Sequence, residues 1–224
     1  MSAKKITIRL DKDTAVTGVW TAPNAAKAVL VLAHGAGAGM THKSMEAIAE
    51  GLAERAIATL RFNFVYMEKG SGRPDAPPLA HKAIRAAVAE ANKLAPKLPL
   101  FAGGKSFGGR MTSQAQSIEA LTGVRGLVFF GFPLHLAGKP GIERADHLKQ
   151  VKLPMLFLSG SRDALAEMPL LMKATTGLKK TATLAVFDDA DHSFHVPART
   201  GRKDPEVMAE ILDTARDWML AHTK

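Results

Sequence analysis

The sequence contains no cysteine. This absence excludes disulfide bonds, thiolate metal ligands and a cysteine nucleophile, so covalent catalysis would need another side chain. Long apolar runs are also missing, because no stretch approaches the roughly 20 residues that span a bilayer. The N-terminal residues MSAKKITIRL include basic side chains but no apolar segment of the kind found in signal peptides. We therefore expect a cytoplasmic protein without a membrane anchor.

Aromatic residues are scarce, with one tyrosine and two tryptophans. Proteins that bind single-stranded nucleic acid stack bases on such side chains, so their scarcity argues against that function. The formal net charge of +9 is spread along the chain, without a run of five like charges. A nucleic-acid partner is therefore not expected. Binding of a polyanion to the basic surface is retained as a weaker alternative.

Short apolar runs alternate with amphipathic runs along the 224 residues. We predict strands at 5–10, 28–35, 58–64, 98–104, 126–132, 154–160 and 182–189. We predict helices at 41–56, 79–95, 107–122 and 205–223. Several strands are apolar throughout, as expected of strands buried on both faces. The pattern predicts one α/β domain over 1–224, a three-layer α/β/α sandwich with a mostly parallel sheet. The first strand and residues 14–20 are expected to pair antiparallel, and residues 68–78 to form a surface loop.

A serine stands between glycines where the strand at 98–104 meets the helix at 107–122. Gly104, Ser106 and Gly108 form a G-x-S-x-G pattern in the sequence GKSFG. A sharp strand-to-helix turn would project the serine from the sheet, and its neighbours must be small to avoid collisions. Gly103 and Gly109 are expected to add further room. The strand–turn–helix context makes Ser106 a candidate nucleophile.

A second glycine-rich turn, HGAGA, begins at His34 directly after the strand at 28–35. Here the backbone could approach a ligand and offer N–H groups to a developing oxyanion. We predict the backbone amides of Ala36 and Phe107 as the two donors, and a bracing role for His34 rather than that of the base. Neither glycine cluster matches a dinucleotide-binding or P-loop pattern. No cofactor and no metal site are predicted.

A carboxylate and an imidazole follow two later strands. Asp163 comes after the strand at 154–160, and His192 comes after the strand at 182–189. A serine hydroxyl needs a base to take its proton, and the imidazole needs a carboxylate to fix its tautomer. The chain order Ser106, Asp163, His192 is that of α/β-hydrolases. His195 is an alternative base. Three further carboxylates share the loop of His192 and could not easily reach behind it: Asp188, Asp189 and Asp191.

The chain resembles the α/β-hydrolase superfamily over almost its full length. More narrowly, it is similar to the small, lidless, dienelactone-hydrolase-like branch, including the hydrolase-like domain of a subunit of the non-specific-lethal chromatin complex. The matching stretches are LAHGAGAG, RFNFVYMEKGSGRPD, AGGKSFGGR, GFPLHLAGKP, LFLSGSRD and DADHSF. The resemblance implies Ser106 as nucleophile, Asp163 as acid and His192 as base. Serine replaces the cysteine of dienelactone hydrolases proper, which argues against their substrate.

The short segment 133–153 between two strands leaves no room for a large lid domain. An exposed or shallow acyl site follows, which suits small or soluble esters. Lys105 is expected to face solvent or pair with a carboxylate. Candidates for the substrate pocket are His34, Tyr66, Met67, Arg73, Phe132 and His135.

The sequence thus predicts a serine hydrolase, a carboxylesterase that acts on a small-molecule ester through a Ser-His-Asp triad and an acyl-enzyme. The alternative is a catalytically silent module that keeps the fold for binding or as a scaffold. Oligomeric state and acyl-chain length are not predicted by the sequence.

Overall fold

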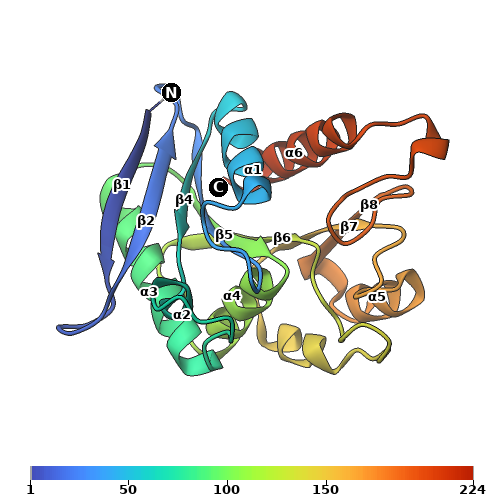
Figure 1. Ribbon diagram of the computed structural model, residues 1–224, viewed down its shortest axis with the longest axis horizontal. Coiled ribbons are helices and arrows are strands. Elements are labelled where there is room, and N and C mark those ends of the chain that lie inside the picture. The colour runs from blue at the N-terminus through green and yellow to red at the C-terminus, as the bar shows by residue number, and fades with distance from the viewer. Residues whose placement is uncertain (1, 224) are drawn as a thin grey trace.

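The computed structural model describes residues 2–223, which form a mostly parallel sheet of eight strands (Figure 1). The strand order is β1-β2-β4-β3-β5-β6-β7-β8. The pairs β1–β2 and β2–β4 are antiparallel, and all later pairs are parallel. The strands are β1 Ser2–Arg9, β2 Ala15–Ala22, β3 Ala28–Ala33, β4 Ile57–Phe62, β5 Leu100–Lys105, β6 Val124–Phe130, β7 Met155–Gly160 and β8 Ala182–Phe187. The predicted antiparallel start is confirmed.

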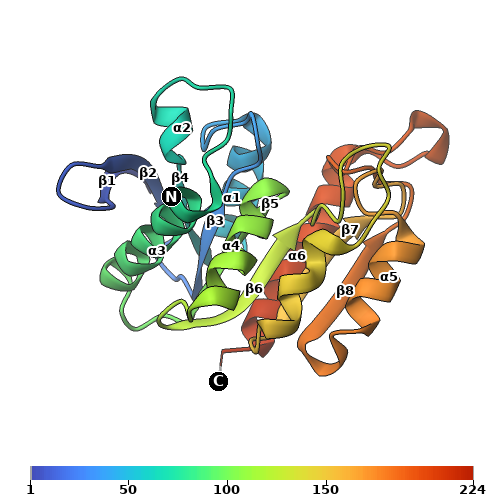
Figure 2. The same cartoon turned by 90° about the horizontal axis from the view of Figure 1, so that it is seen from below.

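Helices cover both faces of the sheet (Figures 1 and 2). One face packs against α1 (Lys43–Glu54) and α6 (Asp204–Ala221). The opposite face packs against α3 (Pro77–Leu94), α4 (Phe107–Ile118), α5 (Met168–Thr176) and the 3₁₀ segment η1 (Glu143–Gln150). Two separate apolar cores result, one on each side of the sheet. The predicted three-layer α/β/α arrangement is therefore confirmed.

The central strands are buried on both faces. Every residue of β3 and β4 is buried, which explains their nearly continuous apolar sequences. The edge strand β8 is only partly buried, because no further strand covers its outer side. The carboxyl ends of β3, β5, β7 and β8 lie at one edge of the sheet, as parallel strands require. Ligands bind outside this edge in open α/β sheets.

The connection from β6 to β7 holds η1 and no lid domain. Three further short elements were not predicted: α2 (Val65–Glu68), η2 (Lys179–Thr181) and η3 (Ala198–Thr200). Helix α5 was also missed. In residues 2–223, the helices are all too short or too polar to cross a membrane.

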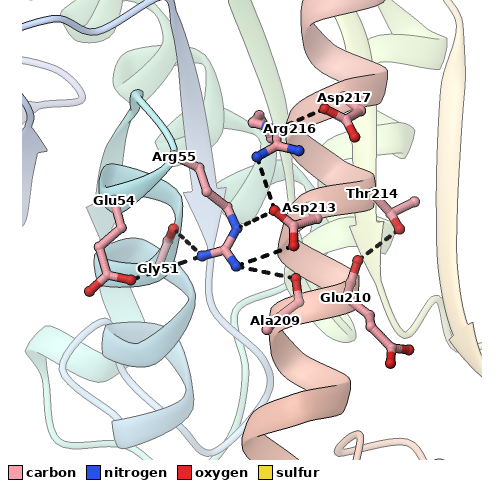
Figure 3. A network of polar contacts seen from close by, with 9 residues as sticks. All are labelled: Gly51, Glu54, Arg55, Ala209, Glu210, Asp213, Thr214, Arg216 and Asp217. Atoms are coloured by element: carbon pink, nitrogen blue, oxygen red, sulfur yellow. Dashed lines mark hydrogen bonds and ion pairs between the residues drawn. The ribbon is translucent and has the colours of Figure 1, made fainter.

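Polar contacts join α1 to α6, which lie side by side on the same face of the sheet (Figure 3). The Arg55 Nε donates to Asp213 Oδ1 over 2.9 Å, and its Nη2 donates to the Ala209 carbonyl over 3.4 Å. The helices also approach closely, since a side chain at Gly51 would overlap Leu212. Helix α1 follows the loop after β3, and α6 follows the loop after β8. Their contact therefore joins the two helices that follow these loops.

Candidate active site

Ser106 occupies a strained turn between β5 and α4. Its φ of 49° and ψ of −114° lie in a region that costs a non-glycine residue about 1–3 kcal/mol. The turn packs so closely on β3 that a Cβ at Gly104 or Gly108 would overlap the carbonyl oxygen of Ala33. Gly103 is equally constrained, because a Cβ there would overlap the Val128 backbone of β6. It is therefore a contact with the neighbouring strand, where the sequence suggested only extra room.

The structure brings Ser106, His192 and Asp163 into one hydrogen-bonded chain. His192 Nε2 lies 2.9 Å from Ser106 Oγ, and His192 Nδ1 lies 2.8 Å from Asp163 Oδ2. A carboxylate only accepts hydrogen bonds, so Nδ1 carries the ring proton and Nε2 presents a lone pair to the serine hydroxyl. In this arrangement the imidazole can accept the proton of Ser106.

Burial and backbone contacts fix the carboxylate. The side chain of Asp163 is fully buried after β7, whereas the His192 side chain is 21% exposed. Asp163 Oδ1 accepts a hydrogen bond of 2.8 Å from the amide of Leu165, which leaves Oδ2 directed at the imidazole. Gly131 also lies close to the ring, since a Cβ there would be 3.3 Å from Nδ1 and from Cε1 of His192. A larger residue at position 131 would therefore crowd the imidazole.

The loop after β3 lies beside Ser106, because a Cβ at Gly35 would be 3.8 Å from the Cβ of Ser106. Ala36 is exposed at this point of the loop. Among the described residues, no acceptor receives a hydrogen bond from the amides of Ala36 and Phe107. Both N–H groups are consequently available to an oxygen atom of a ligand next to Ser106.

His34 braces this loop and does not face the cavity. Its ring is fully buried, with Nδ1 2.8 Å from the carbonyl of Gly35 and Nε2 accepting from the amide of Phe64 over 3.1 Å. Burial lowers the pKa of His34 to about 4, so the ring is neutral at physiological pH. Tyr66 supports the same loop, since its hydroxyl accepts a 3.3 Å hydrogen bond from the amide of Gly37.

Two groups near His192 take part in other contacts. His195 Nδ1 lies 2.8 Å from Asp204 Oδ2 at the start of α6, and both side chains are more than half exposed. The Asp191 carboxylate accepts hydrogen bonds from the amides of Ser193 and His195, so it shapes the loop. In this geometry the nitrogen that faces Ser106 belongs to His192.

A cavity of about 400 Å³ opens at Ser106. Its wall includes Ala36 and His192, with Met45 and Leu165 as apolar parts. His42 and Ser44, at the start of α1, also line it and were not predicted. Both residues follow the loop of Ala36 directly in the sequence, and this position could have indicated that they lie near the site. A larger groove of about 440 Å³ runs between α1 and α6, but its lining includes neither Ser106 nor His192.

None of the six predicted pocket residues lines the cavity at Ser106. Phe132 is 2% exposed and packs in the core against Phe129 and Phe157. His135 is also buried, with Nδ1 2.9 Å from the Leu136 carbonyl. Tyr66 is buried beside His34, Met67 is half-buried, and Arg73 is exposed in the loop before α3. Position after a strand indicated proximity to the edge, but not the direction of each side chain.

Lys105 differs from its prediction as well. Its Nζ donates to the carbonyl of His192 over 3.3 Å and lies 5.4 Å from the centre of the Phe194 ring. In the described part of the chain it forms no ion pair within 4 Å, and burial lowers the pKa of its ammonium group. Lys105 therefore contacts the His192 loop, and the residue is half-buried and lines the cavity at Ser106. No group of three or more potential metal ligands occurs within residues 2–223.

Solved structures share this fold over nearly their whole length. A dienelactone hydrolase from Anabaena variabilis ATCC 29413 superposes with a TM-score of 0.78 at 19% identity, covering 100% of this chain and 99% of its own. An α/β serine hydrolase without a lid from Xanthomonas campestris superposes with a TM-score of 0.75 at 22% identity, and the match covers 97% of this chain and 95% of the other. Est1E from Butyrivibrio proteoclasticus superposes with a TM-score of 0.72 at 16% identity, and the match covers 97% of this chain and 99% of the other.

The family model described as "Alpha/beta hydrolase domain" matches residues 26–220, from just before β3 to the last turn of α6. The match includes the serine turn, the loop after β3 and both later loops of the site. The similarity to the chromatin-complex subunit remains a prediction. With almost the whole chain matched and only η1 between β6 and β7, the protein belongs to the alpha/beta hydrolase family and is a small member without a lid.

Proposed function

We propose that the protein is a serine hydrolase that cleaves a carboxylic ester through an acyl-enzyme. The single observation that carries this proposal is the hydrogen-bonded chain from Asp163 through His192 to Ser106. Ser106 is the nucleophile, His192 is the general base, and Asp163 fixes the tautomer and stabilises the imidazolium. The strained turn holds the hydroxyl in place before substrate arrives.

In the first half of the reaction, His192 Nε2 accepts the hydroxyl proton while Ser106 Oγ bonds to the ester carbonyl carbon. The carbonyl oxygen becomes an oxyanion that the amides of Ala36 and Phe107 stabilise. The bond to the alcohol oxygen then breaks, and His192 gives its proton to the departing alcohol. Water attacks the acyl-enzyme in the second half, with His192 again accepting and returning the proton.

The cavity supports a small ester as the substrate. A volume of about 400 Å³ accommodates a short acyl or alcohol group, and no lid covers it. We place the reacting ester here and not in the α1–α6 groove, because this cavity contains both Ser106 and His192.

A fluorophosphonate probe and 4-nitrophenyl acetate and butyrate test the proposal. We expect covalent labelling at Ser106 and ester turnover that falls at least about 1,000-fold in Ser106→Ala and in His192→Ala. Asp163→Asn keeps the shape of the side chain, but its amide can donate a hydrogen bond to His192 Nδ1 and so favour the wrong tautomer. Ester turnover should therefore fall by a comparable factor. Undiminished turnover in Ser106→Ala would contradict the mechanism. Absence of labelling in well-folded protein would favour the catalytically silent binding module.

A further inference from the structure

Two arginines, one of them a helical turn after Ser106, have no carboxylate partner among the described residues. Arg110 is one turn after Ser106 on α4, and its guanidinium carbon lies 5.9 Å from the centre of the Phe107 ring. Arg144 belongs to η1, and its Nη1 donates to the carbonyl of His135 in the loop after β6 over 3.1 Å. Side chains of a helix lean toward its N-terminus, so Arg110 leans toward the Ser106 turn.

The lack of a carboxylate partner distinguishes this pair from the other arginines that are not exposed. Within residues 2–223, Arg110 and Arg144 are half-buried and form no ion pair. Every other arginine that is not exposed there pairs with an aspartate or glutamate: Arg55, Arg61, Arg85, Arg202 and Arg216. The remaining arginines are exposed, where water solvates the charge. Among the arginines of the described residues, a half-buried charge without a carboxylate partner is therefore confined to this pair.

The surroundings of Arg110 add hydrogen-bonding groups, and no carboxylate oxygen of the described residues lies within 4 Å of its guanidinium nitrogens. Its Nε is buried and has no hydrogen-bond partner among the described residues. Burial lowers the pKa of its guanidinium, and the positive charge of Arg144 lowers it further. Burial also lowers the pKa values of His81 on α3 and His147 on η1, to about 4 for His147. Both imidazoles are thus neutral near pH 7, and the guanidinium groups carry the charge.

We propose that Arg110 and Arg144 form a subsite for an oxyanion, a carboxylate or a phosphate, that the substrate carries away from its scissile ester. The inference rests on the proposed function, because it extends the same site across Phe107. Guanidinium groups bind such oxyanions through paired hydrogen bonds, and an anion here would neutralise two adjacent like charges. Neither arginine lines the cavity at Ser106. The two features would therefore hold different parts of one substrate, a small ester with a second, acidic group.

Matched esters test this subsite by turnover. The mono-4-nitrophenyl ester of glutaric acid is compared with 4-nitrophenyl valerate for the acyl side, and 3-carboxyphenyl butyrate with phenyl butyrate for the alcohol side. We expect the wild type to prefer the charged member of one pair. The ratio of kcat/KM, charged to neutral, should fall about 10- to 100-fold in Arg110→Gln and in Arg144→Gln. Arg110→Lys should retain part of the preference, because it keeps the charge but loses the planar fork.

The matched control is Arg9→Gln, which removes an exposed arginine on β1 and should leave the ratio at its wild-type value. No preference in the wild type for either charged ester would overturn the proposal. A preference that survives unchanged in both variants would overturn it as well. Circular dichroism verifies that each variant is folded.

Binding without turnover separates this inference from the hydrolase proposal. Ser106→Ala, with and without Arg110→Gln, is titrated calorimetrically with glutarate and with inorganic phosphate, at constant ionic strength in chloride. We expect one anion to bind and the added substitution to weaken it at least about tenfold. The better ligand identifies carboxylate or phosphate as the recognised group. Binding that depends on Arg110 in a protein without esterase activity would support the subsite alone. Esterase activity with no anion binding and no charge preference would contradict the subsite and leave the hydrolase proposal standing.

Discussion

Glycine at 104 serves packing as much as the direction of Ser106. A Cβ at this position would overlap the Ala33 carbonyl oxygen of β3, which the sheet holds in place. We expect Gly104→Ala to lower the free energy of unfolding by about 2–4 kcal/mol and to reduce ester turnover, because β3 and β5 must separate. Chemical denaturation measures the loss. Gly72→Ala is the control, since nothing lies within 4 Å of that position and its stability should change by less than about 0.5 kcal/mol. Equal stability of both variants would contradict the steric argument.

His34 links the loop after β3 to the pH dependence of stability. Burial lowers its pKa from 6.5 to about 4 in the folded protein. As pH falls through 6.5, the unfolded chain binds a proton at this ring while the folded protein does not. The contribution of neutral His34 is therefore complete above about pH 6.5 and is lost toward pH 4, a change of roughly 3 kcal/mol.

Unfolding free energies measured from pH 7.5 to 4.5 should show this decline, to which His147 adds because its pKa is also lowered to about 4. Histidine ring NMR identifies the residue responsible, since the His34 signal should keep the neutral chemical shift down to about pH 5 and begin to move only below it. A His34 ring that titrates near pH 6.5 would show that the loop opens readily.

At the scale of elements, α1 and α6 follow the two loops that flank Ser106, and Arg55 joins the two helices (Figure 3). Its guanidinium reaches Asp213 and the Ala209 carbonyl of α6, and its side chain is 16% exposed. We expect Arg55→Gln to cost about 1–3 kcal/mol in unfolding free energy, because charge-assisted bonds between two helices are lost. Arg216→Gln is the matched control. Arg216 pairs with Asp213 and Asp217 within α6, so its loss should cost at most about 0.5 kcal/mol. Equal midpoints in urea for the two variants would contradict a bridging role.

Much of the element order could be predicted, because burial on both faces leaves apolar runs that are visible in sequence. The strand predicted at 28–35 corresponds to β3 Ala28–Ala33, and the helix predicted at 205–223 corresponds to α6 Asp204–Ala221. Helix α5 was missed because its nine residues, MPLLMKATT, are too few for an apolar periodicity to stand out. The short α2 and the 3₁₀ segments offer still less periodicity, and their positions follow from packing.

The sequence predicted those parts of the candidate site whose position depends on backbone topology. It did not predict the parts that depend on the direction of individual side chains. Parallel strands bring their carboxyl ends to one edge, so chain order alone placed Ser106, Asp163 and His192 near each other. None of the pocket candidates lines the cavity at Ser106, because side-chain direction does not follow from topology. Phe132 follows a strand but turns into the core, and His34 turns toward Phe64. Arg110 and Arg144 were missed because a lack of carboxylate partners becomes visible only in three dimensions.

For the whole molecule, the net charge of +9 acts at longer range than any one arginine. A positive potential raises the local concentration of an anionic ester and speeds its encounter with the site, whereas a neutral ester is unaffected. Salt screens this attraction, since the Debye length falls from about 30 Å at 0.01 M to about 3 Å at 1 M.

We therefore expect kcat/KM for the wild-type protein's preferred charged ester to fall several-fold between roughly 20 mM and 500 mM sodium chloride. The value for its neutral counterpart should stay nearly constant across the same series. Steady-state kinetics of the matched pair at fixed pH measures both, with the neutral ester correcting for effects of salt on the chemistry. Arg9→Gln should leave the salt dependence nearly unchanged, because it removes only one distant charge and none of the local hydrogen bonds. If both esters respond to salt alike, the basic surface has no part in substrate capture.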